Sequence, residues 1–104
     1  MSKDASEADL RRRYRELISN VLPAEIDRPI RFDHCFARVV LDWLFEDVWY
    51  GHVDRPAYAN LTADQLRRCI DRMERWREDS EVLVRDNSAS KTRRRLKKAA
   101  DSTR

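Results

Sequence analysis

The sequence predicts an all-α fold, a compact three-helix domain followed by a disordered basic C-terminal tail. Only one glycine and three prolines occur among the 104 residues, whereas β-sandwiches and barrels need many tight turns that are built from such residues. Apolar residues recur at helical spacing in three separate segments. Charged residues make up 39% of the chain, so the apolar 41% must concentrate on a few helix faces. We place the helical domain at residues 1–86 and the tail at 87–104.

The first helix is predicted over residues 7–22. Ser6 followed by Asp9 resembles a capping box, with aspartate in place of the usual glutamate. Pro23 is expected to end the helix, because the residue before a proline disfavours the helical conformation. The apolar stripe of this helix consists of Leu10, Tyr14, Leu17, Ile18 and Val21.

The second helix, predicted over residues 33–50, should be the central one. Asp33 is a good N-cap residue, and Gly51 fits a left-handed C-terminal cap. At ~100° per residue the apolar side chains cover an arc of roughly 200°. We therefore expect this helix to pack on more than one side and to dominate stability. These side chains are Phe36, Val39, Val40, Leu41, Trp43, Leu44 and Val48.

The third helix, predicted over residues 62–84, has the clearest start signal in the chain. Thr62 and Gln65 form a capping box, and Leu61 with Leu66 forms the hydrophobic staple around it. The buried stripe then consists of Leu66, Cys69, Ile70, Met73 and Trp76.

The basic charge of the chain is concentrated in the tail. Residues 87–104 have a net charge of +6, and residues 1–86 have a net charge of −3. We expect the third helix to fray between Ser80 and Asp86. From Asn87 onward only Leu96 is large and apolar, which is too little burial to offset the entropy of ordering. The tail, which also contains Arg104, could bind nucleic acid or an acidic partner through Lys91, Arg93, Arg94, Arg95, Lys97 and Lys98.

The composition excludes several classes of protein and site. One glycine cannot supply a G-x-G-x-x-G loop or a P-loop, and no apolar run approaches the ~20 residues of a membrane span. The N-terminus lacks the apolar segment of a secretory signal. His34, Cys35, His52 and Cys69 match no zinc-binding spacing, so we predict no metal and no cofactor. We expect a protein with free thiols that is intracellular and cytoplasmic, with a nuclear location as the alternative.

The most unusual segment surrounds the start of the second helix. His34, Arg38 and Asp42 are four residues apart and share one face, with Cys35 at its edge. In one interpretation they form a catalytic site, in which His34 is an acid or base and Arg38 holds an anion. In the other, Asp33 caps the helix, Arg38 and Asp42 form an ion pair, and Cys35 is a half-buried filler rather than a reactive thiol.

Aromatic residues gather around the end of the central helix. Trp43, Trp49, Tyr50 and Tyr58 are either packing residues or an exposed recognition patch, since Trp and Tyr are common interface anchors. We take Trp49, Tyr50 and Tyr58 as the candidate partner-binding residues.

The run R-F-D-H-C-F-A-R-V-V-L-D, followed by V-W-Y and by R-P-A-Y, L-T and Q-L, resembles a family of short helical proteins. Members begin with a helix such as L-R-x-R-Y-R-x-L-I and carry a P-I-R-x-D-H-C-F segment, which correspond here to Leu10–Ile18 and Pro29–Phe36. The resemblance covers roughly residues 10–85. It implies a helical fold and a shared role for Arg31–Asp42. Some members are labelled as related to GNAT acetyltransferases, which implies a transferase activity.

These observations lead to three hypotheses about function. The first is a small non-catalytic interaction protein whose partner is another protein, and it predicts an exposed Trp49 or Tyr58 and no closed pocket. The second is a small acetyltransferase-related enzyme that uses the face of His34 and Arg38. The third is a nucleic-acid-binding accessory protein that uses the basic tail.

Overall fold

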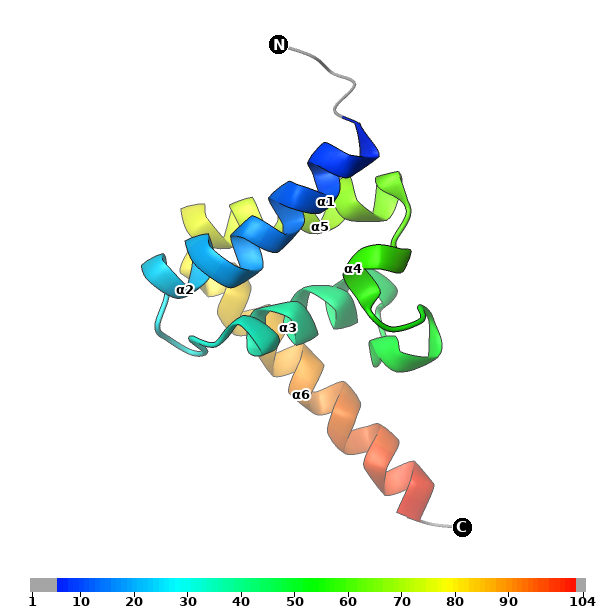
Figure 1. Cartoon of the computed structure of the whole chain (residues 1–104). Helices are drawn as coiled ribbons and strands as arrows, with labels where there is room; N and C mark the ends of the chain where they lie inside the picture. The colour runs from blue at the N-terminus through cyan, green and yellow to red at the C-terminus, as the bar shows by residue number, and fades with distance from the viewer. Residues whose placement is uncertain (1–5, 103–104) are drawn as a thin grey trace.

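The computed structural model describes residues 6–102 of the chain, and the side chains of residues 6–100. All regular elements of this part are helical, which confirms the predicted class (Figure 1). The elements are α1 (Glu7–Glu16), the π-helical η1 (Leu17–Val21), α2 (Leu22–Glu25), α3 (Asp33–Phe45), the 3₁₀ turn η2 (Trp49–Gly51), α4 (Ala57–Asn60), α5 (Ala63–Glu78) and α6 (Ser80–Ser102).

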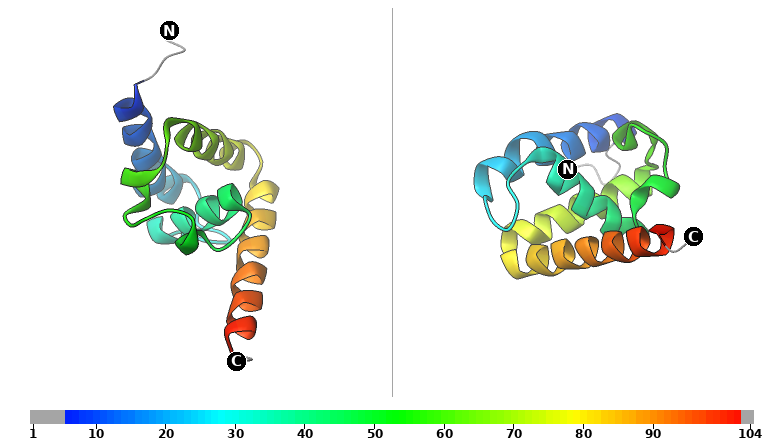
Figure 2. Two further views of the ribbon diagram at one scale, coloured as in Figure 1. Left: turned by 90° about the vertical axis from the view of Figure 1, so that its right-hand side faces the viewer. Right: turned by 90° about the horizontal axis from the view of Figure 1, so that it is seen from below.

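The central position of α3 organises the packing. It contacts α5, α6 and η1, so it packs on more than one side, as its wide apolar arc predicts. The continuous rod of α1, η1 and α2 lies along α5, and the C-terminal end of α6 projects beyond the rest of the molecule (Figures 1 and 2). No helix among residues 6–102 combines the length and the apolar character that a membrane crossing requires.

The predicted apolar stripes form one core. Trp76 and Phe36 are its largest fully buried side chains, and their ring centroids are 6.5 Å apart. The predicted residues that are buried are Leu10, Tyr14, Leu17, Ile18, Phe36, Val39, Val40, Leu41, Leu44, Val48, Leu66, Cys69, Met73 and Trp76.

The sequence predicted that the first helix ends at Pro23, but the helical rod continues past this proline. It continues to Glu25 and ends at Ile26, whose backbone is extended. The π-helical segment η1 precedes the proline, and the N–H of Leu22 bonds to the carbonyl of Leu17. Proline has no N–H to donate, and a π turn shifts which carbonyls receive a bond. The rod therefore passes the proline without a break.

The end of the central helix also differs from the prediction. It ends at Phe45 rather than near residue 50, and Glu46 is the left-handed residue, with φ 53° and ψ 34°. The N–H of Asp47 bonds to the carbonyl of Asp42 and the N–H of Glu46 to that of Trp43, which is the Schellman pattern. Gly51 has no positive φ, so it does not serve as the expected left-handed cap.

Replacing Glu46 by glycine is expected to raise the free energy of unfolding by about 0.5–1 kcal/mol, because a left-handed backbone strains a residue with a Cβ. Urea unfolding followed by circular dichroism would measure this gain. Gly51→Ala is the matched control, because an added Cβ at Gly51 meets no atom within 4 Å. We expect Gly51→Ala to be neutral or slightly stabilising. A loss of stability in Glu46→Gly would contradict the assigned cap.

The start of α3 differs from the prediction by one position. Phe32 is its N-cap, and its side chain makes no capping bond. Asp33 is the first helical residue, and its Oδ1 accepts a hydrogen bond of 2.7 Å from the backbone N–H of His34. The carboxylate therefore still lies at the positive end of the helix dipole, where it is stabilising.

The capping box that starts α5 is confirmed. The Thr62 hydroxyl accepts from the Gln65 N–H at 3.1 Å, and the Gln65 side chain accepts from the Thr62 N–H at 2.9 Å. The helix ends at Glu78, and the backbone of its C-cap Asp79 is extended. The Asp79 carboxylate then accepts the N–H of Glu81 at 3.1 Å, so the expected fraying is replaced by a sharp turn into α6.

The disordered tail that the sequence predicted is instead helical, since α6 runs without a break across residue 87 to Ser102. Val82 and Leu83 bury its first turn in the core, and further along Asp86, Asn87 and Ser90 are buried polar residues. Each of these three makes a side-chain hydrogen bond. Polar contacts thus compensate for the scarcity of apolar residues. Arg104 of the expected tail lies outside the described residues, as do residues 1–5.

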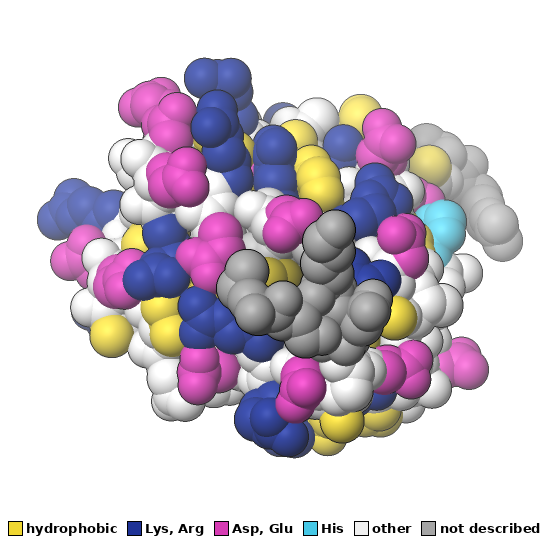
Figure 3. Space-filling model, turned by 90° about the horizontal axis from the view of Figure 1, so that it is seen from above, with side chains coloured by type: hydrophobic (Ala, Val, Ile, Leu, Met, Phe, Trp, Pro, Cys, Tyr) yellow, Lys and Arg dark blue, Asp and Glu magenta, His cyan; other side chains and the backbone are white. Residues whose placement is uncertain are grey.

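Ion pairs join the first rod to α5 on the surface. Arg13 bonds to Glu74 at 2.8 Å, and Arg77 bonds to Glu25 and to Glu74, each at 2.8 Å. Seen from above, basic and acidic side chains are interspersed, with small hydrophobic areas between them (Figure 3). Such mixed surface charge contributes little stability per pair.

Candidate functional site

The candidate catalytic residues of α3 do not line a common cavity. The side chain of His34 is 78% exposed and stacks on Phe32 with ring centroids 5.8 Å apart. Arg38 donates to Oδ1 of Asn87 at 2.7 Å rather than forming the predicted pair with Asp42. Cys35 is half-buried. Neither these residues nor Asp42 lines any of the four surface hollows described for residues 6–100.

Asp42 is a fully buried carboxylate that joins three elements. Its Oδ2 accepts from the hydroxyl of Ser90 at 2.6 Å and from Nε of Arg94 at 2.9 Å. Its Oδ1 accepts from the backbone N–H of Trp49 at 3.2 Å, and its backbone carbonyl accepts from Arg93 at 3.2 Å. These contacts position α6 and Trp49 relative to α3.

Trp49 and Tyr50 connect Arg94 and the buried Asp42 to the surface of the protein. The hydroxyl of Tyr50 accepts a 2.9 Å hydrogen bond from Arg94. The Arg55 guanidinium lies over both rings, 5.4 Å from the centroid of Trp49 and 4.7 Å from that of Tyr50. Tyr50 remains 49% exposed, and Trp49 is half-buried.

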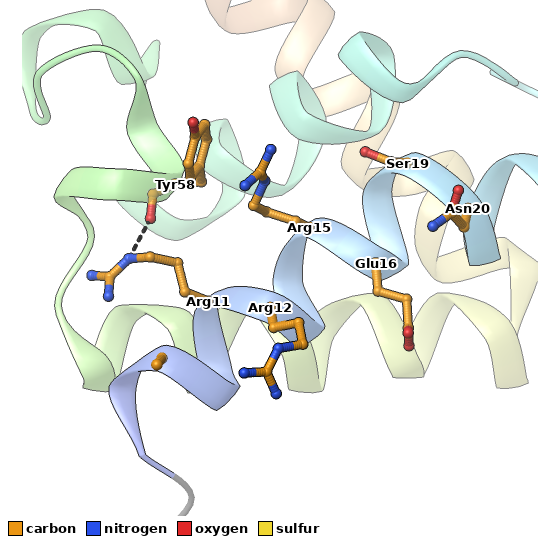
Figure 4. A pocket seen from close by; sticks show the side chains of 8 residues that line it. Arg11, Arg12, Arg15, Glu16, Ser19, Asn20 and Tyr58 are labelled. Carbon is orange, nitrogen blue, oxygen red and sulfur yellow. Dashed lines mark hydrogen bonds between the residues drawn. The ribbon is translucent and has the colours of Figure 1, made fainter.

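Tyr58 belongs to α4 and contacts α1. The Arg15 guanidinium lies 4.3 Å from the centroid of its ring, and Arg11 donates to the backbone carbonyls of Tyr58 and Leu61 at 2.8 and 2.9 Å. Figure 4 shows Arg15 beside the Tyr58 ring and Arg11 at its carbonyl. Arg11 thus holds α4 against α1.

Trp43 is separate from the other aromatic residues. It contacts Arg68 and Arg72 of α5, whose guanidinium carbons lie 5.7 and 4.9 Å from its centroid. It lines a different hollow, of about 320 Å³. The predicted aromatic group is therefore two groups, and the candidate binding residues Trp49 and Tyr58 belong together.

Trp49 and Tyr58 line a mainly apolar cavity of about 430 Å³, which we call the Trp49–Tyr58 pocket. Its walls come from the first helical rod, α3 and the segment from η2 to α4. The residues that line it are Tyr14, Arg15, Ile18, Ser19, Ala37, Leu41, Trp49, Arg55, Pro56, Ala57 and Tyr58.

The pocket can bind an anion but has little means of moving a proton. Its lining has no His, Cys, Asp or Glu, and burial raises the pKa of Tyr14, which keeps that hydroxyl neutral. Arg15 and Arg55 are exposed at its rim, and neither forms an ion pair with a carboxylate of residues 6–100. General acid–base catalysis needs a group that titrates near the working pH, and this lining does not supply one.

A more polar hollow of about 620 Å³ adjoins the pocket (Figure 4). The two share Arg15, Ser19 and Tyr58, and the polar hollow adds Arg11, Arg12 and Glu16 among others. Arg11 and Arg12 already pair with Glu7 and Asp9, so this hollow has mixed charge.

The two cysteines are free, and neither lines this pocket. Cys69 is fully buried, and burial raises the pKa of its thiol to about 12, so it is unreactive at neutral pH. No three His, Cys, Asp or Glu side chains of the described part come together as a metal site would require.

Comparison with protein-family models, with curated proteins and with solved structures finds no match to this chain. The geometry of the pocket and of the charged surfaces is therefore what indicates a function.

The sequence indicates two aromatic residues of the pocket wall, Trp49 and Tyr58, but not its two arginines. Arg15 and Arg55 are 40 positions apart in the sequence, and each stands among many other arginines. The signal that distinguishes them is spatial, since both line the same pocket. Each also stacks on an aromatic ring, and neither is paired with a carboxylate of residues 6–100.

Proposed function

We propose that the protein is a non-catalytic interaction module that binds a segment of a partner protein in the Trp49–Tyr58 pocket. The segment would insert an apolar or aromatic side chain and place a carboxylate of a neighbouring residue at Arg15 and Arg55. The observation that carries the proposal is the combination of an apolar cavity with two exposed guanidinium groups that have no carboxylate partner among residues 6–100.

The size and lining of the pocket support this function. Its volume of about 430 Å³ lies within the ~300–1,000 Å³ of typical ligand sites. Burial of one large apolar side chain contributes about 1.5–3 kcal/mol. Aromatic residues such as Trp49 and Tyr58 are also the most common anchors of binding energy at interfaces.

The walls of the pocket are held in place before a partner arrives. The buried carboxylate of Asp42 holds the backbone of Trp49, and Arg11 holds the backbone of Tyr58. A preorganised site loses less conformational entropy on binding. This rigidity favours recognition of a defined side chain over loose adsorption.

The two rim arginines favour an acidic segment. Arg15 stacks on Tyr58 and Arg55 stacks on Trp49 and Tyr50. Stacking restrains a guanidinium and leaves its planar fork of donors available for a carboxylate. A partner with aspartate or glutamate beside its apolar anchor would satisfy both groups.

The acetyltransferase alternative has no comparable support. His34 is exposed away from the pocket, and Arg38 and Asp42 make hydrogen bonds to α6. We therefore place the function in binding rather than in transfer chemistry.

Binding of labelled acidic peptides would test the proposal. The probe is a short fluorescein-labelled peptide with one central Phe flanked by Glu residues, and the reference peptides carry central Ala, or Gln in place of Glu. We expect the Phe peptide to bind about tenfold more tightly than the Ala peptide, from the burial of one aromatic ring. Fluorescence anisotropy would measure the affinities, and ¹⁵N-resolved NMR shifts should locate the bound peptide at Ala37, Trp49 and Tyr58.

Variants of the pocket provide the controls. Ala37→Leu should block the cavity without a change in charge, and Arg15→Gln/Arg55→Gln should weaken binding of the Glu peptide more than that of the Gln peptide. Arg75→Gln, an exposed arginine on α5, is the matched control and should leave the affinity unchanged. Equal affinity for the Phe and Ala peptides, or full binding by Ala37→Leu, would overturn the proposal.

A further inference from the structure

We propose that the exposed face of the C-terminal half of α6 is a rigid binding surface for the phosphate backbone of double-stranded nucleic acid. The inference is independent of the Trp49–Tyr58 pocket. Residues 87–100 contain six basic residues and no acidic one, and the C-terminal end of this helix projects beyond the rest of the molecule (Figures 1 and 2). A helix with this charge that extends into solvent fits a polyanion.

The fold divides the basic residues of this half-helix into two sets. Arg93 and Arg94 turn inward, where Arg93 bonds to the carbonyl of Asp42 and Arg94 pairs with its carboxylate. The other four, Lys91, Arg95, Lys97 and Lys98, are exposed. Lys91, Arg95 and Lys98 are four and three positions apart, which places them along one helix face. The first set attaches the helix to the body, and the second presents a line of positive charge.

Anchoring of the helix distinguishes this surface from a flexible basic tail. A disordered segment must lose conformational entropy when it orders on a partner. Here that cost is already met by the contacts of Asp42 with Ser90 and Arg94. The charged face is therefore presented in a fixed line before a nucleic acid arrives.

The composition of the face favours nucleic acid over a protein or a membrane. Leu96, 64% exposed, is the one exposed large hydrophobic residue among residues 87–100. Protein interfaces need aromatic or other apolar anchors at their centre, and helices that lie on membranes need a broad apolar face. Binding to a phosphate backbone needs only cations, which replace the counterions of the polymer.

The test is binding of the full chain to a fluorescein-labelled 20-base-pair DNA duplex by fluorescence anisotropy at several salt concentrations. Each phosphate contact contributes about −0.9 to the slope of log affinity against log salt. Three contacts therefore predict a loss of about 40-fold between 50 and 200 mM salt. Lys91→Gln/Arg95→Gln/Lys98→Gln should weaken binding at least tenfold at low salt and lose most of this salt dependence.

Arg28→Gln/Arg67→Gln/Arg75→Gln is the matched control, because it also removes three positive charges, but from exposed sites outside α6. We expect it to bind within twofold of the unchanged protein, and both triple variants should keep the helical content seen by circular dichroism. Equal weakening by the two triple variants would show an effect of net charge alone and would overturn the proposal. Absence of binding at 50 mM salt, or tighter binding to phosphatidylserine vesicles than to DNA, would also overturn it.

Discussion

Replacing Asp42 by alanine is expected to lower the free energy of unfolding by about 3 kcal/mol, at the lower end of the range for breaking a buried ion pair. The substitution leaves Arg94 without its carboxylate partner, and the hydroxyl of Ser90, which is fully buried, without its acceptor. The N–H of Trp49 loses its bond as well. A buried polar group without a partner costs about 1–3 kcal/mol. Arg94 is 25% exposed, and water therefore offsets part of its loss.

Urea unfolding followed by circular dichroism would measure the effect of Asp42→Ala. Asp71→Ala is the control, because it removes an exposed carboxylate from α5 and should change the free energy of unfolding by less than about 0.5 kcal/mol. If Asp42→Ala lost no more stability than this control, α6 could not be held by Asp42. The rigid presentation of the basic face of α6 would then lose its physical basis.

Replacing Trp76 by alanine is expected to lower the free energy of unfolding by about 3–5 kcal/mol, the range for removing a large aromatic side chain from a core. Trp76 is fully buried and packs near Phe36. Its indole Nε1–H also donates to Oδ2 of Asp86 at 2.8 Å. Since domains of this size have a total stability of about 5–15 kcal/mol, the variant should be close to unfolding at room temperature.

Trp76→Phe separates packing from hydrogen bonding at the same position. It keeps most of the apolar contact, and Asp86 retains the two hydrogen bonds from Arg72 at 2.7 and 2.9 Å. We expect its loss to be about half that of alanine, as judged from the denaturation midpoints of both variants. Equal losses in the two variants would contradict the assignment of Trp76 as a packing residue.

The candidate site could be predicted only in part. Trp49 and Tyr58 stood out because tryptophan and tyrosine are rare and favour interfaces, and the structure places both in one pocket. His34 and Asp42 also stood out, by their shared helix face, but one is exposed and the other is buried against α6. Helical periodicity gives the direction in which a side chain points away from the axis of its own helix. It does not show whether solvent or another helix lies in that direction.

The helical class, the apolar stripes and the capping box of Thr62 and Gln65 could all be predicted from the sequence. Each of these depends on residues within about one helical turn of one another, so it leaves a local pattern. Tertiary structure alone decided that α6 is anchored and that Arg15 and Arg55 meet at one pocket. The bond between Asp42 and Arg94 joins residues 52 positions apart, and such polar contacts have no periodicity. Their physical origin is the requirement that every buried polar group find a partner, which only the folded chain can meet.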